Sequence, residues 1–155
     1  RALMPEDPIL GCLKSGMKSS RGEIFAITDG GMHHNAAATG NFGQTLKRPY
    51  PIAVVNRPGR SSGSAVNLVG PLCTPLDSFG RQLPLGDLAV GDLLVVLQSG
   101  AYARAASPLN FLGHPTPAEV WVAKGQAREI RRRGQWQDAL HDQVSEPSPV
   151  KDFDG

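Results

Sequence analysis

Glycine and proline interrupt this chain at short intervals. The 155 residues include 18 glycines and 13 prolines, which together make up about a fifth of the sequence. Proline lacks a backbone donor and glycine favours turns, so this composition favours many short strands over long helices. A chain of this length also suits one domain with a substantial hydrophobic core. We therefore expect an all-β domain.

The charge and the cysteines exclude several classes of partner. A net charge of +2 is too small to indicate nucleic-acid binding, and no window is apolar over the length that a membrane span requires. Cys12 and Cys73 lie far apart and match no disulfide or metal-site spacing, which favours a reducing cytoplasm and no metal. The chain starts at Arg1 without a signal-peptide pattern, which indicates a piece of a longer protein.

Apolar runs bounded by turn residues predict the strands. The runs cover residues 23–28, 51–55, 65–69, 93–97, 118–122 and 127–130. The first 22 residues could hold at most one short strand more. The second and third of these runs should pair antiparallel across a polar loop. The continuous apolar run at residues 93–97 should be buried on both faces, at the centre of the core.

These elements add up to a small β domain. The total is about six or seven strands, typical of a closed or partly open β-barrel or sandwich. Trp136 and Leu140 lie four residues apart and predict a short C-terminal helix within residues 135–144. The domain should cover residues 23–144. Residues 1–22 would be a partial N-terminal connector, and the Pro-rich, acidic residues 145–155 a disordered tail.

Three polar groups stand just after apolar runs. Cys73 and Asp77 follow the run at residues 65–69, and Tyr102 follows the run at residues 93–97. A rigid sheet can present such groups to a ligand from its strand ends. The alternative is that Cys73 is a small buried apolar residue, Asp77 a turn former and Tyr102 a half-buried strand residue.

Four motifs follow one another in a recognisable order. They are Thr28-Asp29-Gly30-Gly31-Met32, then Gly70-Pro71-Leu72-Cys73 with Asp77, then Gly91-Asp92 with Gly100-Ala101-Tyr102, then Pro117-Ala118-Glu119-Val120. The series resembles the C-terminal barrel domain of the fold-type III, pyridoxal-phosphate-dependent decarboxylases, which act on diaminopimelate, ornithine and arginine. The resemblance covers about residues 21–122.

Further motifs resemble one branch of that family. His33-His34, the run Gly40-Asn41-Phe42-Gly43-Gln44 and the run Cys73-Thr74-Pro75-Leu76-Asp77 are similar to the branch associated with exosortase systems and carrier-protein-bound amino acids. The diaminopimelate enzymes of the family have a carboxylate where this chain has Thr74. A distal ammonium of the substrate would lose its ionic partner there. The amino-acid substrate, free or carrier-bound, therefore stays open.

The resemblance implies roles for several residues. The family's N-terminal (β/α)8 domain carries the Schiff-base lysine, and no lysine of this chain lies in a matching motif. Tyr102 would reach the cofactor phosphate, and Cys73 would enter the neighbouring active site of a head-to-tail homodimer as a proton donor. Asp77, Tyr50 and Arg48 would lie on the substrate side. Alternatively, Asp77 braces its turn, and Arg48 is a surface cation beside a packed ring.

The sequence allows two other functions and two other kinds of site. The chain could instead be a silent β-barrel module for dimerisation or carrier-protein docking, or an alanine-racemase barrel, which lacks the pattern from Cys73 to Asp77. His33 and His34 are adjacent and would face opposite sides of a strand, which favours packing over a shared metal ion. Residues 131–133, three arginines, are typical of a solvated strand edge rather than a nucleic-acid patch.

Overall fold

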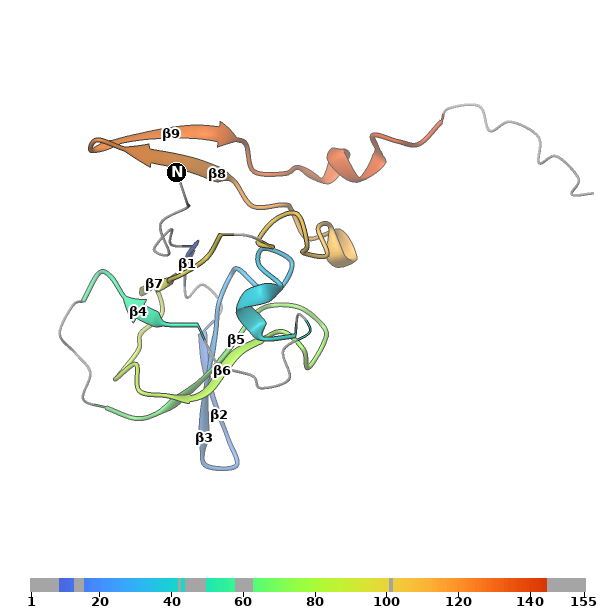
Figure 1. The fold of residues 1–155 in the computed structure, drawn as a ribbon. Coiled ribbons are helices and arrows are strands. Elements are labelled where there is room, and N and C mark those ends of the chain that lie inside the picture. The colour runs from blue at the N-terminus through green and yellow to red at the C-terminus, as the bar shows by residue number, and fades with distance from the viewer. Residues whose placement is uncertain are drawn as a thin grey trace, which may run out of the picture. The chain divides into compact units, whose positions relative to one another are not determined.

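The computed structural model describes residues 9–12, 16–41, 43, 50–57, 63–100 and 102–144. The chain divides into two compact units, Arg1–Phe111 and Leu112–Gly155. The first unit contains two sheets, and the second contains a two-stranded hairpin (Figure 1). No helix in the described ranges is both long and apolar enough to span a membrane.

The first sheet has three antiparallel strands in the order β1-β7-β4. They are β1 (Ile9–Cys12), β7 (Leu93–Val96) and β4 (Ile52–Val54). Leu94, Val95 and Val96 of the middle strand are all buried. The predicted central strand at residues 93–97 is thereby confirmed. A strand that pairs on both edges and is buried needs an uninterrupted apolar sequence.

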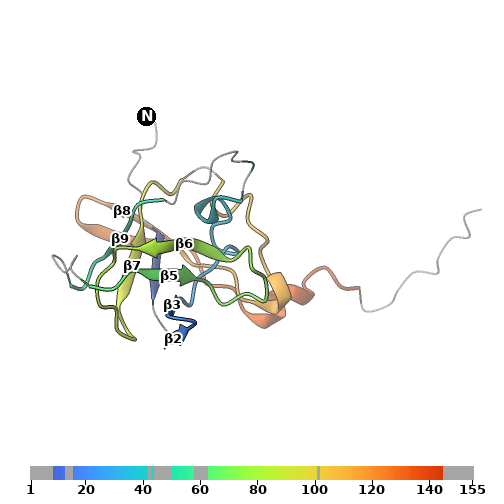
Figure 2. The ribbon, with the colours of Figure 1, turned by 90° about the horizontal axis from the view of Figure 1, so that it is seen from below.

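The second sheet has four strands in the order β2-β3-β5-β6 (Figure 2). They are β2 (Gly16–Ser20), β3 (Glu23–Ile27), β5 (Val66–Val69) and β6 (Ser78–Leu83). Arg21 and Gly22 both have positive φ angles, 51° and 79°, and join β2 to β3 in a tight hairpin turn. The β3–β5 pair is parallel, and the other two pairs are antiparallel.

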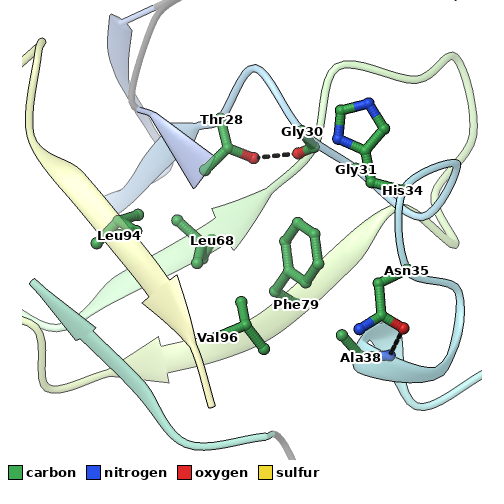
Figure 3. A pocket seen from close by; sticks show the side chains of 10 residues that line it. All are labelled: Thr28, Gly30, Gly31, His34, Asn35, Ala38, Leu68, Phe79, Leu94 and Val96. Atoms are coloured by element: carbon green, nitrogen blue, oxygen red, sulfur yellow. Dashed lines mark hydrogen bonds between the residues drawn. The ribbon is translucent and has the colours of Figure 1, made fainter. Parts of the chain in front are cut away.

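One hydrophobic core joins the two sheets. Leu94 and Val96 of β7 belong to the same buried cluster as Leu68 of β5 and Phe79 of β6, and Figure 3 shows these side chains around one pocket. Burial of each such side chain contributes about 1.5–3 kcal/mol to folding. The strands of these two sheets therefore form a sandwich-like core, and neither strand order closes into a barrel.

The all-β prediction is confirmed, but the strand count is wrong. The described residues contain nine strands rather than six or seven, and the first 22 residues hold two of them, β1 and β2. Strand β2 was missed because it is largely exposed and polar. Strand β6 was missed because its middle is Gly80-Arg81-Gln82, where the register against β5 shifts. The expected domain limits at residues 23 and 144 stay predictions.

The predicted pairing of residues 51–55 with residues 65–69 is also wrong. Strand β4 pairs with β7, whereas β5 pairs with β3 and β6. Asn67 explains part of this placement, because it is buried in the middle of β5. It accepts a hydrogen bond from the Gln82 backbone N–H (3.1 Å) and donates one to Glu23 (3.0 Å). A buried amide needs such partners on both neighbouring strands.

The second unit contains the hairpin of β8 (Glu119–Ala123) and β9 (Gln126–Arg131), followed by the 3-10 helix η3 (Trp136–Leu140). A short helical turn, η2 (Phe111–Gly113), lies at the junction of the units. The predicted hairpin and short C-terminal helix are confirmed. Arg131 pairs with Glu119, and Arg132 with Asp138, all at exposed positions. These contacts fit the solvated strand edge expected for residues 131–133.

Candidate functional site

The parallel strands β3 and β5 place two connections at the same edge of their sheet. Residues 28–41, here called the histidine segment, follow β3, and residues 70–77, the cysteine loop, follow β5. The Thr28 N–H donates to the Val69 carbonyl (2.9 Å), which continues the parallel ladder by one step. The Thr28 hydroxyl donates to the Gly30 carbonyl (2.6 Å) and turns the chain away from the sheet (Figure 3).

Asp77 joins these two connections. Its carboxylate is buried, and it accepts hydrogen bonds from the backbone N–H groups of Met32 (2.7 Å) and Leu72 (2.8 Å). A Cβ atom on Gly31 or Gly70 would come within 2.6 Å or 2.2 Å of this carboxylate. Two glycines therefore make room for one acidic side chain. The geometry favours the alternative that Asp77 braces its turn over a direct contact with substrate.

Cys73 lies on the outside of the braced loop, with an exposed, unoxidised side chain. The loop is fixed on both sides of this residue. The Thr74 N–H donates to the Leu72 carbonyl (2.8 Å), and the Leu76 N–H donates to the Thr74 hydroxyl (3.3 Å). Asn41 of the histidine segment donates to the Leu76 carbonyl (2.7 Å). The alternative of a buried apolar cysteine is therefore wrong.

Tyr102 lies in a third connection, of which residues 99–100 and 102–107 are described and are here called the tyrosine segment. Its side chain is 62% exposed, and its φ angle is 64°. Asn35 donates from Nδ2 to the Ser99 hydroxyl (2.9 Å), and the Ser107 hydroxyl accepts from the Ala36 N–H (2.9 Å). The tyrosine segment is thus held against the histidine segment, and Tyr102 is largely exposed.

The histidine segment packs its own histidines. The His33 side chain is buried, and its ring centroid lies 3.9 Å from that of His34. A Cβ atom on Gly30 would come 2.9 Å from His34 Nδ1, so the ring lies close over this glycine. The 3-10 turn η1 (Ala37–Thr39) follows. In the described part of the chain, no three His, Cys, Asp or Glu side chains are grouped as a metal site requires.

A pocket lies between the histidine segment and the core. It is small, with a cavity volume of about 30 Å³, and it is partly open to solvent. Its walls are largely the apolar core side chains of Figure 3, with His34 and Asn35 at one side. Neither Cys73 nor Tyr102 lines it. The pocket therefore does not bring the predicted site residues together.

The structure gives less support to the remaining site residues. Tyr50 is half-buried and packs against the hydrophobic core, which favours the packed-ring alternative. Arg48 lies outside the described residues. Of the lysines within the described ranges, Lys18 lies on β2 and Lys124 in the turn between β8 and β9, both exposed. Neither belongs to the three connections that hold Cys73, Asp77 and Tyr102.

Sequence reasoning missed Asn35, Asn41 and Ser107, which bind the three connections together. The Asn35 Oδ1 accepts from the Ala38 N–H (3.3 Å), and Asn just before a run of alanines is a local signal for such a bond at the start of a helical turn. No local pattern, however, indicates a partner as far away as Ser99. The histidine segment contacts both other connections, so it brings the loop of Cys73 and the segment of Tyr102 to one end of the fold.

Comparisons with known proteins identify the family. The model of the pyridoxal-dependent decarboxylase, C-terminal sheet domain, matches residues 12–100. L-glutamyl-[BtrI acyl-carrier protein] decarboxylase of Niallia circulans is 44% identical over 134 residues, which cover 84% of this chain and 31% of that protein. Diaminopimelate decarboxylase of Bacillus subtilis is 29% identical over 116 residues, covering 75% of this chain and 25% of the relative.

A solved structure agrees with the fold. The crystal structure of diaminopimelate decarboxylase from Helicobacter pylori complexed with L-lysine superposes with a TM-score of 0.71 at 22% identity, covering 86% of this chain and 30% of that one. The chain thus spans about a third or less of the length of these relatives. The family match includes the histidine segment and the cysteine loop with Cys73. The chain therefore belongs to the pyridoxal-dependent decarboxylases, as the C-terminal sheet domain of that family.

Proposed function

We propose that this chain completes the active site of a pyridoxal-phosphate-dependent amino-acid decarboxylase. The observation that carries the proposal is the histidine segment, which holds an exposed thiol on one side and an exposed phenol on the other. A scaffold that fixes the backbone around two reactive groups and leaves their side chains exposed is suited to a site completed by another surface.

The Tyr102 phenol fits the cofactor phosphate. Its O–H can donate a hydrogen bond to a phosphate oxygen, and a hydrogen bond to an ionised acceptor is stronger than a neutral one. Its exposure leaves it accessible to a group bound mainly by another domain. Pyridoxal phosphate, when bound, supplies the electron sink that decarboxylation of an amino acid requires. A (β/α)8 domain would supply the lysine that anchors the cofactor.

The Cys73 thiol would supply a proton. In a head-to-tail homodimer, its Sγ would enter the active site of the partner subunit. There it would transfer its proton to the carbon that has lost carbon dioxide, and the resulting thiolate would regain a proton from solvent. The exposed position of Cys73 on a braced loop supports this role. Asp77 would position the cysteine loop, whereas contacts of Tyr50 and Arg48 with substrate stay predictions.

An amino acid bound to a carrier protein is the substrate class we favour. The relative that acts on a glutamyl-carrier protein is 44% identical to this chain, whereas the Bacillus subtilis diaminopimelate decarboxylase is 29% identical. Thr74 adds independent support, because its hydroxyl accepts the Leu76 N–H within the loop and carries no charge for a distal ammonium. A free diaminopimelate would therefore be a poor substrate.

The test is the Cys73→Ala variant of the intact enzyme, assayed for carbon dioxide release from a glutamyl-carrier protein. Loss of a general acid should lower kcat by about 10²- to 10⁴-fold with a smaller change in KM. Ser19→Ala on the exposed strand β2 is the matched control and should keep the wild-type rate. An unchanged kcat for Cys73→Ala would favour the silent dimerisation or docking module instead.

The chain alone offers a second test. These 155 residues, mixed with pyridoxal phosphate, should develop no visible absorbance band of a lysine-bound cofactor. Such a band would mean that Lys18, Lys124 or another lysine of this chain anchors the cofactor, which would contradict the division of roles between two domains.

A further inference from the structure

We propose that Asn35 and Ser107 are positioning residues that fix Tyr102 for the cofactor phosphate. The inference rests on the proposed role of Tyr102 and adds the residues that would make that role possible. In the tyrosine segment, the φ angle of Tyr102 is 64°, and Gln98, just before the segment, has a φ angle of 60°. Residues other than glycine rarely adopt this left-handed region, so the surrounding structure must hold them there.

Hydrogen bonds from two neighbouring residues of the histidine segment hold the tyrosine segment on both sides of Tyr102. On the N-terminal side, Asn35 donates from Nδ2 to the Ser99 hydroxyl (2.9 Å). On the C-terminal side, the Ala36 N–H donates to the Ser107 hydroxyl (2.9 Å), which itself donates to the Ala103 carbonyl. Because Asn35 and Ala36 are adjacent, the two attachment points are fixed relative to each other.

Asn35 is itself firmly placed. Its side chain is 2% exposed, and its Oδ1 accepts from the Ala38 N–H (3.3 Å) at the start of η1. Ser99 is 6% exposed, so water cannot easily replace the bond between the two side chains. The phenol of Tyr102, in contrast, is exposed. This combination of a buried support and an exposed donor pre-organises the phenol for a ligand outside this domain.

A positioning role predicts a defect that is specific for phosphate. The measured quantity is the ratio of two dissociation constants of the intact apo-enzyme, for pyridoxal and for pyridoxal phosphate, each followed by absorbance titration. Tyr102→Phe should lower this ratio by about tenfold or more, because it removes a hydrogen bond to an ionised group. Ser107→Ala and Asn35→Ala should lower it by about three- to tenfold, through misplacement of the same phenol.

Conservative variants separate positioning from folding. Ser107→Thr keeps a hydroxyl and should restore most of the ratio. Ser99→Ala removes the hydroxyl that accepts from Asn35 Nδ2 but keeps Asn35 and its acceptor for Ala38, so it should keep the helical turn and still lower the ratio. In the Tyr102→Phe background, Ser107→Ala should lower the ratio no further, since both changes act on one phenol. Ser19→Ala should leave the ratio unchanged.

These measurements separate the positioning role of Asn35 and Ser107 from the role of Tyr102 at the phosphate. If Tyr102→Phe leaves the ratio unchanged, the role of Tyr102 at the phosphate fails. If Tyr102→Phe lowers the ratio but Ser99→Ala and Ser107→Ala do not, only the positioning proposal fails. Equal weakening of both ligands by Ser107→Ala would indicate a general loss of packing and would also overturn it. Should Ser107→Ala fail to fold by circular dichroism, Ser99→Ala and Ser107→Thr decide the question.

Discussion

Asp77 and Asp138 both hold a turn by accepting hydrogen bonds, but in different surroundings. Asp77, in the first unit, is 3% exposed and accepts from the backbone N–H groups of Met32 and Leu72. Asp138, in the second unit, accepts from the Gln135 N–H (2.8 Å) and from both terminal nitrogens of Arg132, at an exposed position. The hydrogen bond with Arg132, followed by that with Gln135, lowers the pKa of Asp138 to about 2.

The surroundings decide what each carboxylate contributes. Water can replace the partners of Asp138, and dissolved salt screens its attraction to Arg132, so pairs of this kind contribute little to stability. No water replaces the partners of a buried carboxylate, so their loss leaves unsatisfied groups. The turn beside Cys73 is thus held by buried hydrogen bonds that salt hardly affects. The ion pair that holds the connection between β9 and η3 weakens as the salt concentration rises.

The largest expected effect comes from Gly70→Ala. The added Cβ would come 2.2 Å from Asp77 Oδ2, and the carboxylate is pinned by two backbone donors. We expect the free energy of unfolding to fall by about 2–3 kcal/mol, measured by urea denaturation with circular dichroism. Gly100→Ala is the control, because its Cβ would meet nothing within 4 Å. Equal effects of the two substitutions would show that Asp77 moves aside easily.

Asp77→Asn tests the buried carboxylate directly. The amide keeps the size of the side chain but turns an NH2 group toward the N–H of Met32 or of Leu72. The free energy of unfolding should fall by about 1–3 kcal/mol. Asp138→Asn, measured in the same way, should have a much smaller effect. If both variants lose the same stability, burial does not distinguish the two turns.

A third carboxylate, that of Asp92, extends the comparison to stability at low pH. Burial raises its pKa, but hydrogen bonds from Arg57, Ala89 and Asn56 outweigh burial and lower it below the usual 3.8. A group with a lowered folded-state pKa stabilises the fold above its unfolded-state value, and this contribution is lost as the pH falls through the folded-state value.

The melting temperature of the wild type should therefore drop as the pH is lowered below about 4. Asp92→Asn should melt lower than the wild type at pH 7, and the gap between the two should narrow in acid. A gap that stays constant from pH 7 to pH 2 would contradict this contribution of Asp92.

The smallest effect should come from Arg132→Gln. Removal of the guanidinium leaves the Gln135 N–H bond to Asp138 in place, and the exposed ion pair contributes little. Any loss in melting temperature should appear at low ionic strength and vanish near 0.5 M salt, where the screening length is about 4 Å. A loss that persists at high salt would place Arg132 in a packing role.

The sequence was informative where one residue type decides the structure locally. The apolar residues of β7 predict a buried strand without knowledge of any neighbour, and Cys73 and Tyr102 were correctly placed just after strands. Strand β6 was missed because its Gln82 has a positive φ angle near a register shift. The Gln82 N–H there donates to the side chain of Asn67 on β5. A pattern within one strand contains no such information.

The same limit applies to the candidate site. The hydrogen bonds from Asn35 to Ser99 and from Ala36 to Ser107 join residues 64 and 71 positions apart. The pairing of β4 with β5 was predicted because the two strands are neighbours in sequence. The parallel partner of β5 is instead β3, which lies much earlier in the sequence. Single groups could therefore be predicted, whereas the contacts that position them could not.

The strand order β1-β7-β4 has a consequence for how the protein is made. Ile9 of β1 and Ile52 of β4 both lie opposite Val96 of β7. Both edge strands of this sheet therefore depend on β7, which is the last of its three strands to be synthesised. A nascent chain that has not yet passed residue 96 can form the β2–β3 hairpin but not this sheet. Such long-range closure is slow, and the domain should acquire its fold late in synthesis, in one step that a truncation before β7 would prevent.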